Sequence, residues 1–206
     1  MKSLRNSKGF TLVELAIVLV IIGIIIGAVL KGQELINNAK MKRVYNQYRE
    51  ILAAVYTYYD KYNYYPGDDP NAKGRWPSVT NGDGNGLIAV GIGSTAPNFA
   101  CTGTGTEQCD LWAELRLANI LTGSGFSNPR HAYGGAIAVS YYTMPAVAGG
   151  TPLLAHWIHF QNVPYDVCQA IDRTYDDGNA GAGSIRGTAD YMAATSGVFQ
   201  LSFKLD

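Results

Sequence analysis

The chain starts with a short polar stretch, continues with a long apolar run, and then mixes apolar and polar residues at helical spacing. From Leu15 to Leu30 there are 16 residues without a charge, and extending the run back to Phe10 gives 21 residues with a single acid, Glu14. About 20 apolar residues are enough for a helix to cross a bilayer. The pattern therefore predicts a membrane-spanning helix that carries one unusual carboxylate.

The helix is expected to continue beyond this run, because apolar side chains recur at spacings of 4, 3, 1, 3, 4 and 3 residues. The predicted apolar stripe consists of Val44, Tyr48, Ile51, Leu52, Val55, Tyr59 and Tyr62. Pro66 and Pro70 cannot continue a helix, and Gly67 permits a turn. We therefore expect one helix from Phe10 to about Tyr62, roughly 80 Å long at 1.5 Å per residue.

The remainder of the chain predicts a small head of mixed structure. Short helices are expected over 109–121 and 163–179, and strands over 134–144, 153–163 and 197–206. In the last strand, apolar side chains alternate with polar ones, as in a half-buried sheet. The fold class is therefore α+β: a long N-terminal α-helix, membrane-spanning in its lower half, packed against a small antiparallel β-sheet head.

Charge is balanced overall but uneven along the chain. Lys2, Arg5 and Lys8 precede Phe10, and without the first nine residues 13 basic side chains face 16 acidic ones. Such a mildly acidic chain has no basic footprint, so we expect no nucleic-acid binding by charge. The basic end of the apolar run is expected on the cytoplasmic side of the membrane.

The stretch "KGFTLVELAIVLVIIGII" (8–25) resembles the N-terminal signature of type IV pilins and type II secretion pseudopilins. The resemblance implies that a prepilin peptidase cuts after Gly9 and that Phe10, the new N-terminus, is N-methylated. It also implies that the Glu14 carboxylate neutralises the Phe10 amine of a neighbouring subunit in a filament. The alternative for Glu14 is a place near the headgroups, to which its side chain extends.

The resemblance implies a domain order of leader peptide (1–9), transmembrane and filament-core helix (10–32), amphipathic upper helix (33–65) and pilin-like head (66–206). The head segments "YPGD", "NGDGNG", "WAELRLANIL" and "IDRTYDDGNAGAG" also have counterparts in pilin-like proteins. The implied function is a structural subunit of a type IV pilus-like filament. The alternatives are a type II secretion pseudopilin, or a minor tip pilin that serves adhesion or DNA uptake.

The implied partners are copies of the chain or other pilins, the prepilin peptidase, and the bacterial inner membrane before assembly. The assembled filament is then a cell-surface pilus or a periplasmic pseudopilus. No catalytic motif is present, and His156 and His159 differ by an odd number, which places them on opposite faces of a strand. We therefore expect no enzyme.

Three cysteines are expected in an oxidising compartment. A bond between Cys101 and Cys109 is favoured, which would contribute roughly 2–3 kcal/mol by the chain-entropy argument. Pairing of Cys168 with either of the other two is the alternative.

No cofactor is required, but calcium is a candidate ligand. In "NGDGNG", Asn81, Asp83 and Asn85 alternate as in the first half of a calcium loop. The position for a bidentate glutamate is Ile92, so further oxygens would have to come from residues such as Asp68 or Asp69. The alternative is a plain Gly-Asn-Asp turn.

Overall fold

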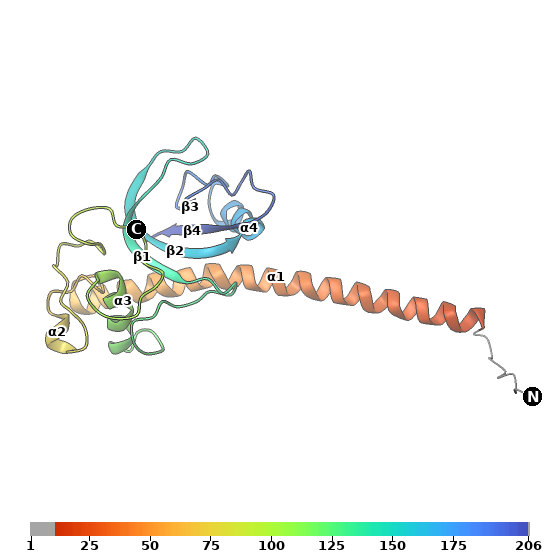
Figure 1. Ribbon diagram of the computed structural model, residues 1–206, viewed down its shortest axis with the longest axis horizontal. Helices are drawn as coiled ribbons and strands as arrows, with labels where there is room; N and C mark the ends of the chain where they lie inside the picture. Colours follow the sequence, from red (N-terminus) through yellow and green to blue (C-terminus); the bar gives the residue numbers. More distant parts are fainter. Residues whose placement is uncertain (1–10, 206) are drawn as a thin grey trace, which may run out of the picture. The chain divides into compact units, whose positions relative to one another are not determined.

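A computed structural model describes residues 11–205 of the chain. The described residues form two compact units, one up to Lys40 and the other from Met41 onward. Figure 1 labels the elements along the chain. They are α1 (Leu12–Tyr62), α2 (Ala72–Arg75), α3 (Glu107–Leu117), β1 (Ile137–Met144), β2 (Leu153–Pro164), α4 (Tyr165–Tyr175), β3 (Ile185–Gly187) and β4 (Val198–Lys204).

Helix α1 ends at Tyr62, which confirms the end predicted from the sequence. Asn63 follows with a φ of 59°, a left-handed conformation that asparagine tolerates better than most residues. Its N–H still donates to the Tyr59 carbonyl at 2.7 Å, and Pro66 prevents any continuation. The long helix is therefore terminated by local chain chemistry.

In the first unit, apolar side chains of α1 are exposed. Leu19 is 69% exposed and Ile24 is 67% exposed. The most apolar window of 18 residues has a mean hydropathy of 3.0, and none of its residues is buried. By length and composition this helix is able to cross a membrane, a test that a signal sequence near the N-terminus also passes.

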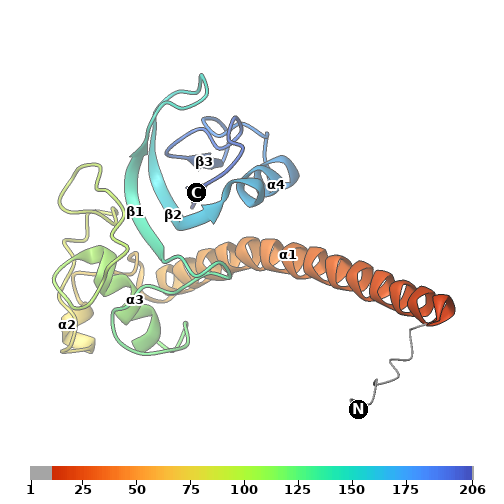
Figure 2. The ribbon, with the colours of Figure 1, turned by 45° about the vertical axis from the view of Figure 1, so that its right-hand side comes forward.

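In the second unit, four strands form an antiparallel sheet of order β1-β2-β4-β3. The sheet lies alongside the C-terminal part of α1, as Figures 1 and 2 both show. Ile158 and Phe203 are buried in one core with Val44 and Val55 of the helix. The ring of Tyr48 stacks on Phe203, with 4.5 Å between centroids. The predicted α+β fold class is thus confirmed.

One part of the predicted apolar stripe is wrong. Tyr58 is fully buried, whereas Tyr59 is 40% exposed. Since Val44, Ile51 and Val55 define the buried line, the next helical step of three residues reaches position 58. Tyr58 rather than Tyr59 therefore belongs to the core.

The predicted short elements exist, but their bounds differ. Helix α3 starts at Glu107 and stops at Leu117, and Asn119 then adopts a left-handed φ of 58°. Strand β2 runs on to Pro164, so α4 begins only at Tyr165, and it ends at Tyr175. The sequence pattern does not predict the short α2 and β3, because four and three residues are too few for a periodic signal.

The favoured disulfide is present. Cys101 and Cys109 are bonded, with 5.2 Å between their Cα atoms, and they tie the loop before α3 to its first turn. Cys168 is a free, buried thiol, and burial raises its pKa well above the usual range. The two alternative pairings with Cys168 are therefore wrong.

Candidate functional site

The first candidate site is the start of α1, where Glu14 interrupts the apolar surface. The Thr11 N–H and the Thr11 hydroxyl both donate to Glu14 Oε2 at 2.8 Å, and the Glu14 N–H donates to Thr11 Oγ1 at 3.3 Å. This reciprocal pair is a capping box, which satisfies backbone donors of the first turn. Glu14 Oε2 thus holds the helix start, and Oε1 has no hydrogen bond to a described residue.

The predicted cleavage residue Gly9 and the predicted methylation residue Phe10 lie outside the described residues, as does the whole leader, 1–9. The predicted assembly residue, Glu14, can be located. It lies in the first turn of an exposed apolar helix with one carboxylate oxygen available for an external partner. In such a setting the natural partner for that oxygen is a cation, because an unpaired carboxylate in an apolar medium is costly.

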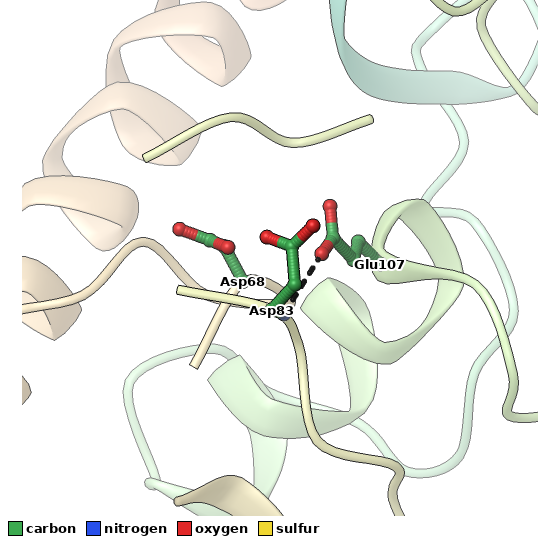
Figure 3. A group of neighbouring side chains, drawn as sticks. All are labelled: Asp68, Asp83 and Glu107. Atoms are coloured by element: carbon green, nitrogen blue, oxygen red, sulfur yellow. Dashed lines mark hydrogen bonds between the residues drawn. The ribbon is translucent and has the colours of Figure 1, made fainter. Parts of the chain in front are cut away.

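The second candidate site is a cluster of carboxylates in the head, shown in Figure 3. Asp68 comes from the turn after α1, Asp83 from the glycine-rich loop and Glu107 from the start of α3. One oxygen of each lies within 4.8 Å of one oxygen of the others. Sequence reasoning identified Asp83 and named Asp68 as a further oxygen source, but it missed Glu107, whose distance in the chain gave no signal.

Backbone N–H groups hold the Asp68 carboxylate in place. Its Oδ1 accepts from Gly84 at 2.8 Å and from Asn85 at 3.1 Å, and its Oδ2 accepts from Gly86 at 2.8 Å. The loop approaches Asp68 so closely that a Cβ on Gly82 would collide with the Asp68 backbone. Glycine at this position is therefore a packing requirement, and the carboxylate organises the loop around it.

Electrostatics in this cluster favour a positive partner. Burial raises the pKa of Glu107 to about 7, although the Ala89 N–H donates to its Oε2 at 2.9 Å. Burial also raises the pKa of Asp68, which is fully buried. Carboxylate oxygens are the ligands that calcium prefers, and a bound cation would relieve the repulsion between these carboxylates.

All three residues of the predicted calcium loop accept a backbone hydrogen bond on a side-chain oxygen. Asn81 Oδ1 accepts from the Lys73 N–H at 2.8 Å, and Asn85 Oδ1 accepts from the Leu87 N–H at 2.7 Å. Asp83 Oδ1 similarly accepts from the Asn85 N–H at 3.0 Å. The local geometry is that of Asx turns, and the carboxylates brought close to Asp83 come from outside the motif. Calcium binding itself stays a prediction.

A neighbouring group of polar side chains is buried against α3. Asp69 forms an ion pair with Arg75 and accepts from the Tyr58 hydroxyl at 2.9 Å. Glu114 is fully buried, and its Oε2 accepts from the Gly67 N–H at 2.7 Å, while Oε1 has no partner among the described residues. Burial raises the pKa of Glu114 to about 7. Glu114 thus ties the turn after α1 to α3. Asp69 ties the same turn to Tyr58 of α1 and Arg75 of α2.

The histidines form no catalytic arrangement among the described residues. Register places Ala138 opposite His159 and Tyr141 opposite His156, so the two rings face opposite sides of β2, as predicted. His159 is fully buried between Ser140 and Ser202, at 3.0 and 2.8 Å, and burial lowers its pKa to about 3. A neutral, buried imidazole between two hydroxyls is a structural link across the sheet.

A second acidic group lies at the end of α4, in the segment 172–177. Oxygens of Asp172, Asp176 and Asp177 lie within 4.8 Å of one another. Asp172 accepts from the Tyr191 hydroxyl at 2.7 Å, and Asp176 accepts from the Ile185 N–H at 2.7 Å. Gly178 follows with a φ of 72°, a left-handed conformation that glycine adopts readily.

Comparison with known protein families identifies the N-terminal segment. Residues 4–30 match the family model described as the prokaryotic N-terminal methylation motif. The chain therefore carries the type IV pilin and pseudopilin signature, which is a signature of structural subunits and not of enzymes. No curated protein and no solved structure matches the chain.

The matched segment covers the start of the apolar helix, including Glu14, and the residues around Gly9 that lie outside the described part of the chain. Three observations agree: the methylation motif, the exposed apolar helix and the small antiparallel sheet. Together they support a pilin-like or pseudopilin subunit that is anchored in a membrane before assembly.

Proposed function

We propose that the protein is a structural subunit of a type IV pilus-like filament. The prepilin peptidase removes residues 1–9, Phe10 is N-methylated, and the apolar segment 10–32 first anchors the chain in the inner membrane and later forms the filament core. The observation that carries the proposal is the match of residues 4–30 to the methylation motif. The exposed apolar surface of α1 supports it.

In this proposal Glu14 selects the position of the next subunit. Cleavage after Gly9 creates the amine of Phe10, which is positively charged at neutral pH. Glu14 Oε2 is held by Thr11, so Oε1 is the oxygen left to accept from the amine of a neighbour. Breaking a buried pair of this kind costs roughly 3–5 kcal/mol, enough to enforce register between subunits.

The test is an intact mass measured on material sheared from the cell surface and, in parallel, on the membrane fraction. A chain that starts at methylated Phe10 in the sheared fraction is the expected result. If the processed chain is found only in the membrane fraction, a type II secretion pseudopilin or a scarce minor tip subunit replaces the surface pilus as the function.

A matched variant tests the processing step. Gly9→Leu should retain the leader, because a bulky side chain replaces the small residue before the cleaved bond. Gly32→Leu, in α1 with nothing within 4 Å of its added Cβ, serves as the control. Normal processing of Gly9→Leu would remove the assignment to this peptidase.

A further inference from the structure

A small pocket lies where the end of α1 meets the glycine-rich loop. Its volume is about 240 Å³. Tyr59, Tyr64 and Tyr65 line it from the helix end, and Asn85 and Gly86 line it from the loop. The pocket thus combines aromatic surface with backbone and amide groups, which is the composition of many small-molecule sites.

The pocket is built by groups that are fixed without a ligand. Asp68, which also lines the pocket, holds the N–H groups of Gly84 and Gly86 at 2.8 Å each. A Cβ on Gly84 would lie 3.5 Å from the ring of Tyr64, so the loop packs directly on that ring. Binding at this pocket would require little reordering of the chain, which lowers its entropic cost.

Several polar groups of the pocket make no hydrogen bond to any residue that the structure describes. They are the Asn63 side-chain amide and the hydroxyls of Tyr59 and Tyr64. Asn63 provides both a donor and an acceptor, and a tyrosine hydroxyl provides both as well. The site therefore offers hydrogen bonds of both kinds at the edge of an aromatic surface.

The aromatic surface is accessible. Tyr59 is 40% exposed, and its ring tilts by 45° against Tyr65, with 5.0 Å between centroids. The negative face of an aromatic ring attracts the positive edge of C–H groups. A ligand with a flat C–H face and hydroxyls around its rim would match both features of the pocket.

Charge narrows the class of ligand. The fully buried Asp68 is the charged residue of the pocket lining, which includes no lysine or arginine among the described residues. A carboxylate without a cation in the lining disfavours phosphates, nucleic acids and acidic sugars, whereas it does not disfavour a neutral ligand.

We propose that this pocket binds one ring of a neutral pyranose saccharide. The sugar lies with its C–H face on the tyrosine rings, and its hydroxyls bond to Asn63 and to the hydroxyls of Tyr59 and Tyr64. For a ligand of this size at an open site, the dissociation constant is on the order of millimolar. This inference does not depend on filament assembly.

The test is saturation-transfer NMR on the full chain in lipid nanodiscs, which avoids detergents with sugar headgroups. The probes are the methyl glycosides of glucose, galactose, mannose and N-acetylglucosamine, with adenosine as a flat aromatic comparison. We expect transfer to the ring protons of at least one glycoside and a stronger effect on one face of that ring.

Two variants with matched controls test the location. Asn63→Gly removes the amide and keeps the left-handed backbone, and Asn119→Gly makes the same change at a φ of 58° outside the pocket. Tyr59→Ala removes the exposed ring, and Tyr175→Ala removes a ring that is also 40% exposed and lies elsewhere. The two pocket variants should weaken binding about tenfold, and the controls should not.

Three results would overturn the proposal. They are the absence of transfer to all four glycosides, equal binding by the pocket variants and the wild-type chain, and transfer to adenosine in place of the sugars. Thermal unfolding of each variant, recorded in the same nanodiscs, shows whether a loss of binding comes from the pocket or from unfolding.

Discussion

The two units of the chain place their apolar and charged side chains in opposite ways. Between Leu12 and Lys40, residues such as Leu19 and Ile24 are more than 60% exposed. From Met41 onward, large apolar residues fill a core, and acids such as Asp68, Asp69 and Glu114 are fully buried. An exposed apolar surface of this kind normally marks a membrane or a protein partner.

The two units therefore depend on different partners for their stability. The head surrounds its buried acids with internal partners, namely N–H groups, the Tyr58 hydroxyl and Arg75. The described part of the first unit has no buried acid, and its ion pair between Lys31 and Glu34 is exposed. Changes in the first unit should therefore alter assembly, and changes in the head should alter folding.

The largest effect is expected for Glu14→Ala. This variant should insert in the membrane as before, since it only makes the segment more apolar. Loss of a buried pair worth roughly 3–5 kcal/mol should lower the yield of sheared filaments by more than about tenfold. The measurement is immunoblotting of sheared and membrane fractions.

The control for this prediction is Glu34→Ala, which removes an exposed glutamate from the same helix. Its filament yield should stay near that of the wild type. Normal filament yield for Glu14→Ala would contradict the proposed pairing with a neighbour's amine.

The next effect contrasts two adjacent tyrosines of the head. Tyr58→Ala should destabilise the folded head by roughly 3–5 kcal/mol, because removal of a fully buried aromatic side chain leaves a cavity. Tyr59→Ala should cost less than about 1 kcal/mol, because that ring is 40% exposed. Urea unfolding followed by the fluorescence of the buried Trp112 and Trp157 measures both. Similar losses for the two variants would contradict the helix phase that buries Tyr58.

The sequence predicted the architecture well because long periodic patterns carry it. The apolar run, the stripe through Val44 and Val55 and the alternation in 197–206 each repeat over many residues, so single ambiguities do not matter. The choice between Tyr58 and Tyr59 failed for the opposite reason. From Val55, a helical step of three residues reaches Tyr58 and a step of four reaches Tyr59, so the pattern allows either, and packing against the head decides.

The head cluster was only partly predictable, because its members come from three distant segments. "NGDGNG" identified Asp83 by local spacing, but nothing local connects it with Glu107, 24 residues further on. The role of Asp68 depends on the loop closing around it, as the contact with Gly82 shows. The disulfide was easier to predict, because a spacing of eight residues favours a small loop.

A smaller effect is expected from pH, through Glu114. Its pKa is raised by burial from 4.5 to about 7 in the folded chain, so the folded state binds more protons than the unfolded state between these values. The contribution of Glu114 to the stability of the head should therefore be most favourable below about pH 4.5. It should become less favourable as the pH rises towards 7. Urea unfolding at several pH values measures this slope.

Glu114→Gln should reduce that slope and make the head more stable at pH 8 by roughly 1–3 kcal/mol. Glu107, whose pKa is also raised to about 7 by burial, should contribute to the slope that remains. Asp60→Asn, which removes an exposed carboxyl group, is the control for the loss of a charge. A slope that survives intact in Glu114→Gln would show that this side chain does not titrate near pH 7.

The smallest effect is expected from calcium. Its measurement distinguishes two sets of candidate ligands, the residues of the sequence motif and the carboxylate cluster in the structure. At a tenfold excess over the dissociation constant, binding should stabilise the head by about 1.4 kcal/mol, measured as the difference between unfolding in calcium and in chelator. Glu107→Gln should abolish this increment, because it removes a charged oxygen from the group with Asp68 and Asp83. Asn81→Ala should retain it, because the Asn81 oxygen is bonded to the Lys73 N–H. If Asn81→Ala abolished the increment and Glu107→Gln retained it, the calcium ligands would be those of the sequence motif. If the wild-type chain showed no increment, the loop would be a turn held by Asp68 without calcium.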